Sequence, residues 1–534
     1  MSNALSIIRS LIIYSLCLPL AIFLGYLLAV PLDSVSLIIL ATALALPLVP
    51  VLLRWHHLIL IASWNMTMVL FFLPGRPNLW IFMAATSLLV SFLQHILNRN
   101  TRFLSVPSVT RPLIFLVIVI LVTAKLTGGF GMRTIGELTG GVEAFGGKRY
   151  ILLLGAIIGY FAITCHRVPE GRAPAYVALY LLGTLTAVIG NLGPYVYSSL
   201  WFLFLIFPVE NLQFMADRGS EPEGSFALRL GGLTFACMAV ACFVLARHGV
   251  RGLFALGERW SFLPFRAKGG LAVNHPWRIL VFLFMIWVSL LGGYRSVAIL
   301  LALTFLGQFY LEGLFRSQLL PALILILTLA FVVSFPMVNK LPISVQRSLS
   351  FLPIEIDPIA RYSAESSSEW RLQIWRNVMP LIPQYLILGK GYAISPAEMQ
   401  TMQSMSGFQG SGDSTQGATL AGDYHNGPLS VIIPLGVFGA VGFVWFLAAG
   451  YRVLLNNYRH GDSELRMPNT FLLAYFVARV IFFFTVFGSF YAEMVVFTGL
   501  VGMSVSINGG LREAVIQPVE KPAFNQFKLA RTAK

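Results

Sequence analysis

The chain has 534 residues, of which 57% are hydrophobic and only 11% are charged. Long apolar runs recur along it, each able to cross a hydrocarbon core of ~30 Å, so an ordinary soluble protein is excluded. The formal net charge of +15 would favour nucleic-acid binding in a soluble protein. Here the basic clusters lie between apolar runs, as the positive-inside rule predicts, so we expect no nucleic-acid partner.

The apolar runs predict an all-α polytopic membrane protein with about fourteen transmembrane helices. They lack the period-two alternation of a transmembrane barrel, and lipid requires helices in its place. The first run is longer than a usual signal-peptide core and a second follows at once, so it is counted as a helix. The predicted spans lie near residues 11–30, 35–53, 58–73, 79–98, 112–126, 150–166, 175–190, 226–246, 277–293, 295–311, 319–337, 428–449, 470–487 and 491–508.

The Lys and Arg residues of the short loops predict the orientation. Both termini are expected in the cytoplasm. Residues 199–215 would reverse this scheme if they crossed the membrane, so we interpret them as a re-entrant or surface segment on the outer side. Residues 247–270 mix aromatic and basic side chains and are typical of an amphipathic segment on the inner surface. The arginines and lysine that set the orientation are Arg54, Arg99, Arg102, Arg111, Arg167, Arg172, Arg247, Arg251, Arg259, Arg266, Lys268, Arg452, Arg459 and Arg466.

Five segments follow from this topology. Residues 1–276 form the N-terminal transmembrane helices, and residues 277–337 form the helices that carry Arg295. Residues 338–427 form a large loop on the outer, periplasmic side. Residues 428–508 form the C-terminal transmembrane helices, and residues 509–534 form a cytoplasmic tail.

The large outer loop has two parts. Ser366 and Glu369 fit a capping box, and Pro380 predicts where the helix that follows Ser366 ends or kinks. Residues 403–422 are rich in Gly, Ser, Gln and Thr, which is typical of a lid or of slack chain. The apolar face of the predicted helix should rest on the membrane domain and is formed by Trp370, Ile374, Val378 and Leu381.

His425 stands at the end of this loop, directly before a predicted span. By this topology it is the only one of the eight histidines on the outer side. Asn426 can cap the helix and Pro428 suits its first turn, so the helix N-terminus favours a nearby anion and a neutral imidazole. Two interpretations stay open: a base that removes a proton from an acceptor hydroxyl, or an interfacial histidine that hydrogen-bonds loop backbone.

Two further arginines lie at or within the membrane. Arg295 follows Gly-Gly-Tyr at the outer junction of two helices, where it either reaches the lipid headgroups or grips a diphosphate. Arg479 lies near the middle of a span, with Glu493 as a possible partner. A buried charge at that depth indicates either a structural pair or a substrate cavity.

The loop helix carries Arg371, with Arg361 and Arg376 nearby. Glu365 and Glu369 could hold these arginines in a local ion-pair network. Anion binding requires at least one arginine that is not engaged by those carboxylates. The sequence has no Cys-x-x-Cys, His/Cys cluster or phosphate-binding Gly-rich loop, so we expect neither a metal nor another cofactor.

These motifs together resemble the bacterial O-antigen ligase and O-antigen polymerase superfamily. The resemblance covers about residues 277–508: Gly-Tyr-Arg295-Ser between paired helices, then Arg371-x-x-x-Trp375 before Pro380-Leu381, Leu388-Gly-Lys-Gly-Tyr392, and His425-Asn426 before a glycine-rich span.

The resemblance implies a metal-independent glycosyltransferase of the type-C architecture in the bacterial inner membrane, with its active site facing the periplasm. Its donor would be a glycan on undecaprenyl diphosphate, and its acceptor a glycolipid or glycan. His425 matches the proposed base, and Arg295 and Arg371 match the diphosphate-binding arginines. We also expect Arg361, Arg376, Arg479 and Asn426 to line the substrate site.

Ligation to lipid A core is the leading expectation for the reaction, with polymerisation of lipid-linked repeats as the alternative. A polysaccharide or lipid transporter is the competing class, because Arg479 lies at membrane depth. A non-catalytic scaffold for envelope assembly is a third class.

Overall fold

A computed structural model describes residues 25, 49–73, 75–97, 103–104, 106–127, 147–169, 171–209, 230–254, 276–394, 398, 419 and 422–513. Over these residues the fold is helical, and the one isolated bridge joins Val69 and Asn78. The predicted class, an all-α polytopic membrane protein, is therefore confirmed.

Eight helical stretches are long and apolar enough to cross a membrane, among the described residues. The count of about fourteen spans stays a prediction. The predicted spans near 11–30 and 35–53 lie outside the described residues except for Gly25 and residues 49–53. Four apolar helices are shorter: α3 (Val49–Ser63), α13 (Pro276–Leu290), α14 (Arg295–Leu311) and α15 (Leu319–Ser334). The eight stretches are α4 (Leu79–Leu97), α5 (Pro107–Leu126), α7 (Gly147–Thr164), Ala173–Asn191 (α8 Ala173–Leu182, η2 Gly183–Thr186, α9 Ala187–Asn191), α12 (Gly231–Leu253), α21 (Gly427–His460), Ser463–Thr485 (η7 Ser463–Leu465, α22 Arg466–Thr485) and α23 (Phe490–Asn508).

The predicted span at 58–73 was wrong, because α3 ends at Ser63. Polar side chains hold the chain that follows against the stretch containing α8 and η2. The Asn65 amide donates to the Tyr180 carbonyl at 2.7 Å, and the Thr67 backbone N–H donates to the Thr186 hydroxyl at 3.1 Å. These tertiary bonds replace the helical ones that the apolar composition predicted.

Helix α21 is longer than its predicted span of 428–449, and it is kinked at Gly436, where φ is +64°. The chain of Ile387 lies against this glycine so closely that a Cβ would stand 2.4 Å from the Ile387 carbonyl oxygen. The Val437 N–H donates to the Leu386 carbonyl at 2.6 Å. The kink therefore fixes the part of the outer loop that follows α17 against the first turns of α21.

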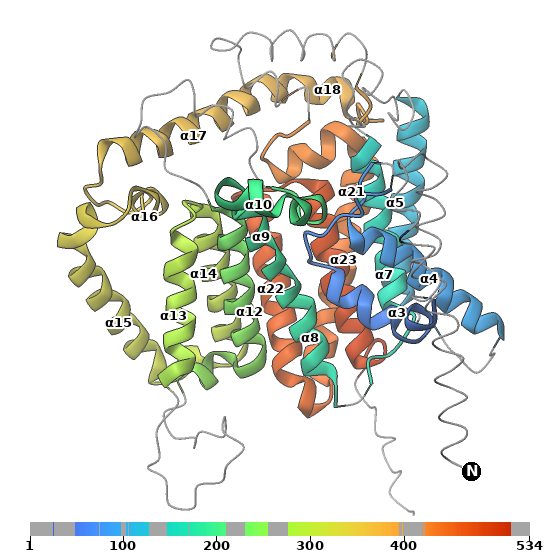
Figure 1. Ribbon diagram of the computed structural model, residues 1–534, viewed down its shortest axis with the longest axis horizontal. Helices are drawn as coiled ribbons and strands as arrows, with labels where there is room; N and C mark the ends of the chain where they lie inside the picture. The colour runs from blue at the N-terminus through green and yellow to red at the C-terminus, as the bar shows by residue number, and fades with distance from the viewer. Residues whose placement is uncertain are drawn as a thin grey trace, which may run out of the picture.

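The large loop contains a long helix, α17 (Pro358–Val378), which lies across one end of the bundle (Figure 1). The expected start at Ser366 was wrong, since Asp357 is the N-cap and Ser366 lies inside the helix. An Asp followed by Pro is itself a helix-start signal, and it acts earlier in the chain than the capping box. The helix ends at Val378, as Pro380 predicted. Shorter helices flank it: η5 (Phe335–Lys340), α16 (Ile343–Ser348), η6 (Met379–Leu381) and α18 (Ile382–Tyr385).

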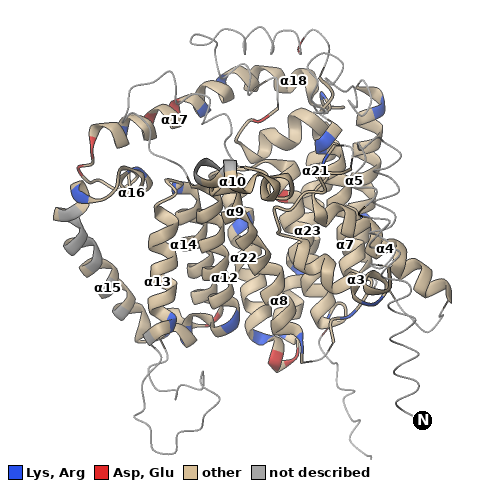
Figure 2. Ribbon diagram, in the orientation of Figure 1, with Lys and Arg blue, Asp and Glu red and all other residues tan. Residues whose placement is uncertain are grey.

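The apolar face of α17 packs on the bundle, as predicted. Ile374 and Val378 are fully buried against Tyr424, Leu429 and Ile433. Acidic and basic residues alternate along the rest of α17, while the central parts of the bundle are mostly uncharged (Figure 2). The helix therefore joins a charged surface to the segment that leads into α21.

The segment interpreted as non-spanning is only partly described. Helix α10 (Gly193–Ile206) has non-helical backbone at Leu200 and lies near the α17 end in Figure 1. It is not among the eight candidate spans of the described residues. Residues 210–215, like 255–270 of the expected surface segment and 514–534 of the expected tail, lie outside the described part, so these interpretations stay predictions.

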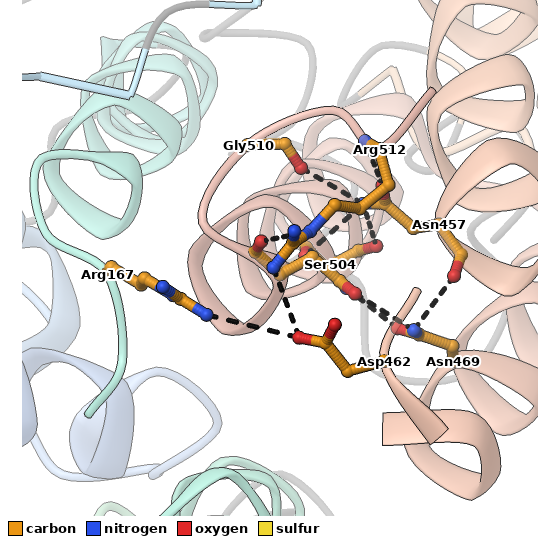
Figure 3. A network of polar contacts seen from close by, with 8 residues as sticks. Arg167, Asn457, Asp462, Asn469, Ser504, Gly510 and Arg512 are labelled. Atoms are coloured by element: carbon orange, nitrogen blue, oxygen red, sulfur yellow. Dashed lines mark hydrogen bonds and ion pairs between the residues drawn. The ribbon is translucent and has the colours of Figure 1, made fainter. Parts of the chain in front are cut away.

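The opposite end of the bundle is closed by a buried amide network (Figure 3). The side-chain amides of Asn469 and Asn508 exchange two hydrogen bonds, at 2.8 and 3.0 Å. The Asn457 amide donates to the Ser504 hydroxyl at 3.0 Å, and its oxygen accepts from the Arg512 N–H at 2.9 Å. The network joins α21, α22, α23 and the chain after α23.

We expect Asn457→Ala to destabilise the protein, because it leaves buried partners unsatisfied at a cost of about 1–3 kcal/mol each. The measurement is the midpoint of thermal unfolding in detergent, which should fall clearly. Asn456→Ala is the matched control, since Asn456 is the neighbouring residue on α21 but is only half-buried. Equal midpoints for the two variants would contradict the role of the network.

Candidate functional site

His425 occupies a constrained turn directly before α21. Its φ is +49°, a left-handed conformation that few non-glycine residues adopt. Asn426 is the N-cap of α21, as predicted, and its side-chain oxygen accepts from the Leu429 N–H at 3.1 Å. On the other side, the Trp375 indole N–H donates to the Tyr424 carbonyl at 2.9 Å. The turn is thus held between α17 and α21.

Two aromatic rings enclose the imidazole. The ring centroid of His425 lies 5.1 Å from that of Trp370 and 5.2 Å from that of Phe487. Its Nε2 lies 3.6 Å from a carboxylate oxygen of Asp423. Its Nδ1 is buried and has no hydrogen-bond partner among the described residues. These contacts include no hydrogen bond from the imidazole to loop backbone, which the second interpretation of His425 required.

The surroundings favour the uncharged form of this imidazole. Burial lowers the pKa of His425 below its ordinary value of 6.5, and the positive charge of Arg371 lowers it further. The carboxylate of Asp423 acts in the opposite direction and raises this pKa, but burial prevails. A neutral imidazole near pH 7 can accept a proton, which is what a general base requires.

Arg371 and His425 contact the same ring. The guanidinium carbon of Arg371 lies 5.9 Å from the centroid of Phe487, within range of a cation–π interaction. Arg371 is half-buried on α17, one residue after Trp370. The structure therefore brings this predicted arginine next to the predicted base.

Arg295 is the first residue of α14, and its side chain reaches α17. Its Nη2 donates to the Ala364 carbonyl and to the Ser368 hydroxyl, both at 3.1 Å, and its Nη1 donates to the Ser350 hydroxyl at 3.3 Å. Ser368 lies only two residues before Trp370, which contacts His425. Arg295 thus binds the helix that carries Arg371 and contacts His425, within about two turns of Arg371.

A large cavity of about 1140 Å³ lies beside α17 and is lined by residues of this helix from Arg361 to Arg376. Its charged lining consists of three arginines and three glutamates. No ion pair within 4.0 Å joins Arg361 or Arg376 to these glutamates, among the residues described. His425 and Arg371 do not line this cavity, but Arg371 lies on α17 and His425 contacts Trp370 of the same helix. The charged lining residues are Arg295, Arg361, Arg376, Glu355, Glu365 and Glu369.

Arg479 lies apart from this group. Its Nη1 is 2.9 Å from a carboxylate oxygen of Glu493, and its Nε and Nη2 donate to the Tyr475 hydroxyl at 3.1 and 2.8 Å. These contacts form the predicted pair between α22 and α23. A substrate-binding role for Arg479 stays a prediction.

One residue of this region was not singled out from the sequence. Arg149, in the first turn of α7, lies beside the chain that leads to His425: a Cβ on Gly422 would stand 2.6 Å from its Nη1. A signal was available, because Lys148 and Arg149 form a basic pair that the predicted topology places outside, against the positive-inside rule. The contact itself could not be predicted, since it depends on tertiary packing.

Comparison with known proteins gives one family. Residues 280–444 match the family model described as O-antigen ligase. No curated protein matches the chain. The matched segment contains Arg295, Arg371, His425 and the whole of α17, but not Arg479. This O-antigen ligase domain confirms the resemblance to the O-antigen ligase and polymerase superfamily over residues 280–444, which are the larger part of the 277–508 over which the resemblance was expected.

Proposed function

We propose that the protein transfers a glycan from undecaprenyl diphosphate to an acceptor hydroxyl at the periplasmic face of the bacterial inner membrane. Ligation to lipid A core is the preferred reaction, because the matched family model is that of O-antigen ligase. In this proposal the architecture is of the type-C glycosyltransferase kind, the α17 end faces the periplasm, and the five segments keep the boundaries expected from the sequence.

The observation that carries the proposal is the position of α17. Through Ser368 it binds Arg295, and through Trp370 it contacts His425, so cationic and basic groups from distant parts of the chain meet on one helix. That arrangement suits a reaction in which an anion departs while a proton is removed.

The chemistry follows from these groups. The acceptor oxygen attacks the anomeric carbon, the bond from that carbon to the phosphate oxygen breaks, and the acceptor proton passes to His425. Negative charge grows on the departing lipid diphosphate, where fixed guanidinium groups such as Arg371 and Arg295 stabilise it. The donor carries its own activation, so the proposal needs neither ATP nor a metal.

The cavity suits the glycan part of the donor. Its volume of about 1140 Å³ is larger than common small-molecule sites, which are about 300–1,000 Å³. Its arginines and glutamates balance in number, so it is not simply a cation cluster for phosphate. Carboxylates accept hydrogen bonds from sugar hydroxyls, and Arg361 and Arg376 can donate to sugar oxygens. We therefore place the sugars in the cavity and the diphosphate nearer Arg295 and Arg371.

The deciding experiment uses the purified protein in detergent, with lipid-linked donor and acceptor glycolipid and no sealed membrane. Chemical transfer of the glycan is expected. A transporter would leave both lipids chemically unchanged. A scaffold would also leave them unchanged, and in that case cells that lack only this protein would still transfer glycan.

The glycolipids of a deletion strain would then separate the two transfer reactions. Loss of glycan-capped lipid A core, with long lipid-linked glycan retained, is the result expected for a ligase. Capping of the core by single repeats would indicate the polymerase reaction in place of ligation.

A further inference from the structure

Arg149 is held by aromatic rings at the outer-loop end of α7. Its guanidinium carbon lies 4.9 Å from the ring centroid of Tyr491, on α23, and 5.7 Å from that of Tyr392. The backbone N–H of Tyr392 in turn donates to the Tyr150 hydroxyl at 2.9 Å, which fixes that ring against α7. The side chain of Arg149 is thus held in one orientation by the two tyrosine rings.

The hydrogen-bonding capacity of this half-buried guanidinium is unused. Among the described residues, Arg149 has neither a hydrogen bond nor an ion pair. Next to it, the hydroxyl of Tyr392 is buried and has no hydrogen-bond partner in the described part of the chain; the residue is 6% exposed. A partly desolvated cation without an acceptor costs stability, and stacked arginines present their N–H edges to planar or tetrahedral anions.

Arg149 lies close to the chain segment that carries His425. The segment 422–426 lies between two elements. Trp375 of α17 binds the Tyr424 carbonyl, whereas Arg149 of α7 lies against Gly422, whose φ of +70° allows the close approach. Arg371 and Arg149 therefore reach the segment that carries the base from different helices.

Glycan transfer needs two lipid-borne substrates at the base together. With the donor diphosphate assigned to arginines on the α17 side, we propose that Arg149 binds the phosphate group of the acceptor glycolipid. This inference rests on the proposed function and extends it to the second substrate. Both acceptors under consideration, lipid A core and a lipid-linked repeat, bear phosphate, so the chemistry is common to them.

The kinetic test varies each substrate while the other is saturating, for the wild type, Arg149→Gln and Arg149→Lys. For Arg149→Gln the KM for the acceptor should rise about 10–100-fold, the loss of a charge-assisted hydrogen bond, while the KM for the donor stays within about twofold. Arg149→Lys should recover part of the acceptor affinity. Lys148→Gln is the matched control, because Lys148 is the exposed neighbour on the same helix turn. A rise in the donor KM in place of the acceptor KM, or no change in either, overturns the inference.

A binding measurement without turnover separates the possible sources of phosphate. The probes are lipid A core glycolipid with and without its phosphates, a lipid-linked repeat, and phosphatidylglycerol, each titrated into wild type and Arg149→Gln in detergent. The wild type should bind one phosphorylated acceptor more tightly than the dephosphorylated form of that acceptor, or more tightly than phosphatidylglycerol. Arg149→Gln should lose this preference and still bind the dephosphorylated glycolipid. Unchanged preference in the variant overturns the inference alone, whereas a wild type that binds donor and acceptor but transfers nothing overturns the proposed function. Equal loss of phosphatidylglycerol binding would reduce Arg149 to a contact with bulk lipid.

Discussion

His425→Ala should lower glycan transfer by purified protein about 10²–10⁴-fold, the contribution typical of a general base. The reason lies in the enclosure of the ring, because no other imidazole of the described residues lies at the α17 end next to Trp370 and Phe487. The measurement is the rate of transfer at saturating donor and acceptor. Donor binding should change little, since the imidazole contacts the acceptor hydroxyl in this mechanism.

The control is His460→Ala. His460 is the last residue of α21, whereas His425 stands two residues before that helix begins, so the two histidines mark opposite ends of one element. His460 is exposed, and its removal should leave the rate unchanged. If His425→Ala retained full turnover with an unaltered thermal midpoint, the assignment of the base would be wrong.

The pH profile provides a second check on the same residue. A base is inactive when protonated, so transfer should fall as the pH drops through the pKa of His425, which lies below 6.5. Asp423 raises this pKa and Arg371 lowers it. Asp423→Asn should therefore move the acidic limb of the profile to lower pH, and Arg371→Gln should move the limb of its residual activity to higher pH. Shifts of the same sign would exclude His425 as the titrating group.

Local patterns in the sequence predicted several structural features around the candidate site and one ion pair away from it. The cap of α21 at Asn426, the apolar face of α17 with Ile374 and Val378, and the pairing of Arg479 with Glu493 depend on short-range spacing or on the high cost of a lone buried charge. Each of these signals lies within a few residues or within one hairpin of helices, so the chain itself carries them.

Other features depend on contacts that no local pattern carries. The irregular chain after Ser63 is held by bonds from Asn65 and Thr67 to a helix more than a hundred residues away, and composition alone cannot reveal them. The cavity and His425 adjoin the same stretch of α17, since Trp370 contacts His425 while Glu369 and Leu372 line the cavity, and this arrangement is likewise a matter of tertiary geometry. Arg149 lies near His425 because α7 packs against α23, and this packing joins distant parts of the chain.

Arg371→Ala should lower kcat/KM for the lipid-linked donor about 10²–10³-fold, the loss expected when one fixed group that stabilises developing charge is removed. Arg371→Lys should recover little of it. The planar guanidinium lies over Phe487 at 5.9 Å and can bind two phosphate oxygens at once, whereas an ammonium is a point charge on a flexible stem. The measurement is donor-dependent transfer at saturating acceptor, with Arg316→Ala, an exposed arginine after the far end of α14, as the control.

Arg295 is expected to contribute both to donor binding and to the stability of the fold. Its guanidinium bonds to Ala364 and Ser368 on α17 and to Ser350, so it positions the helix as well as bordering the cavity. Arg295→Ala should therefore reduce donor use and also lower the midpoint of thermal unfolding. The expected loss of stability follows from the contacts, because Arg295 joins α14 to α17 and to Ser350 through these hydrogen bonds. If Arg295→Ala and Arg371→Ala both kept normal donor kinetics, the diphosphate would have to bind elsewhere, and α17 would be left without the role proposed for it.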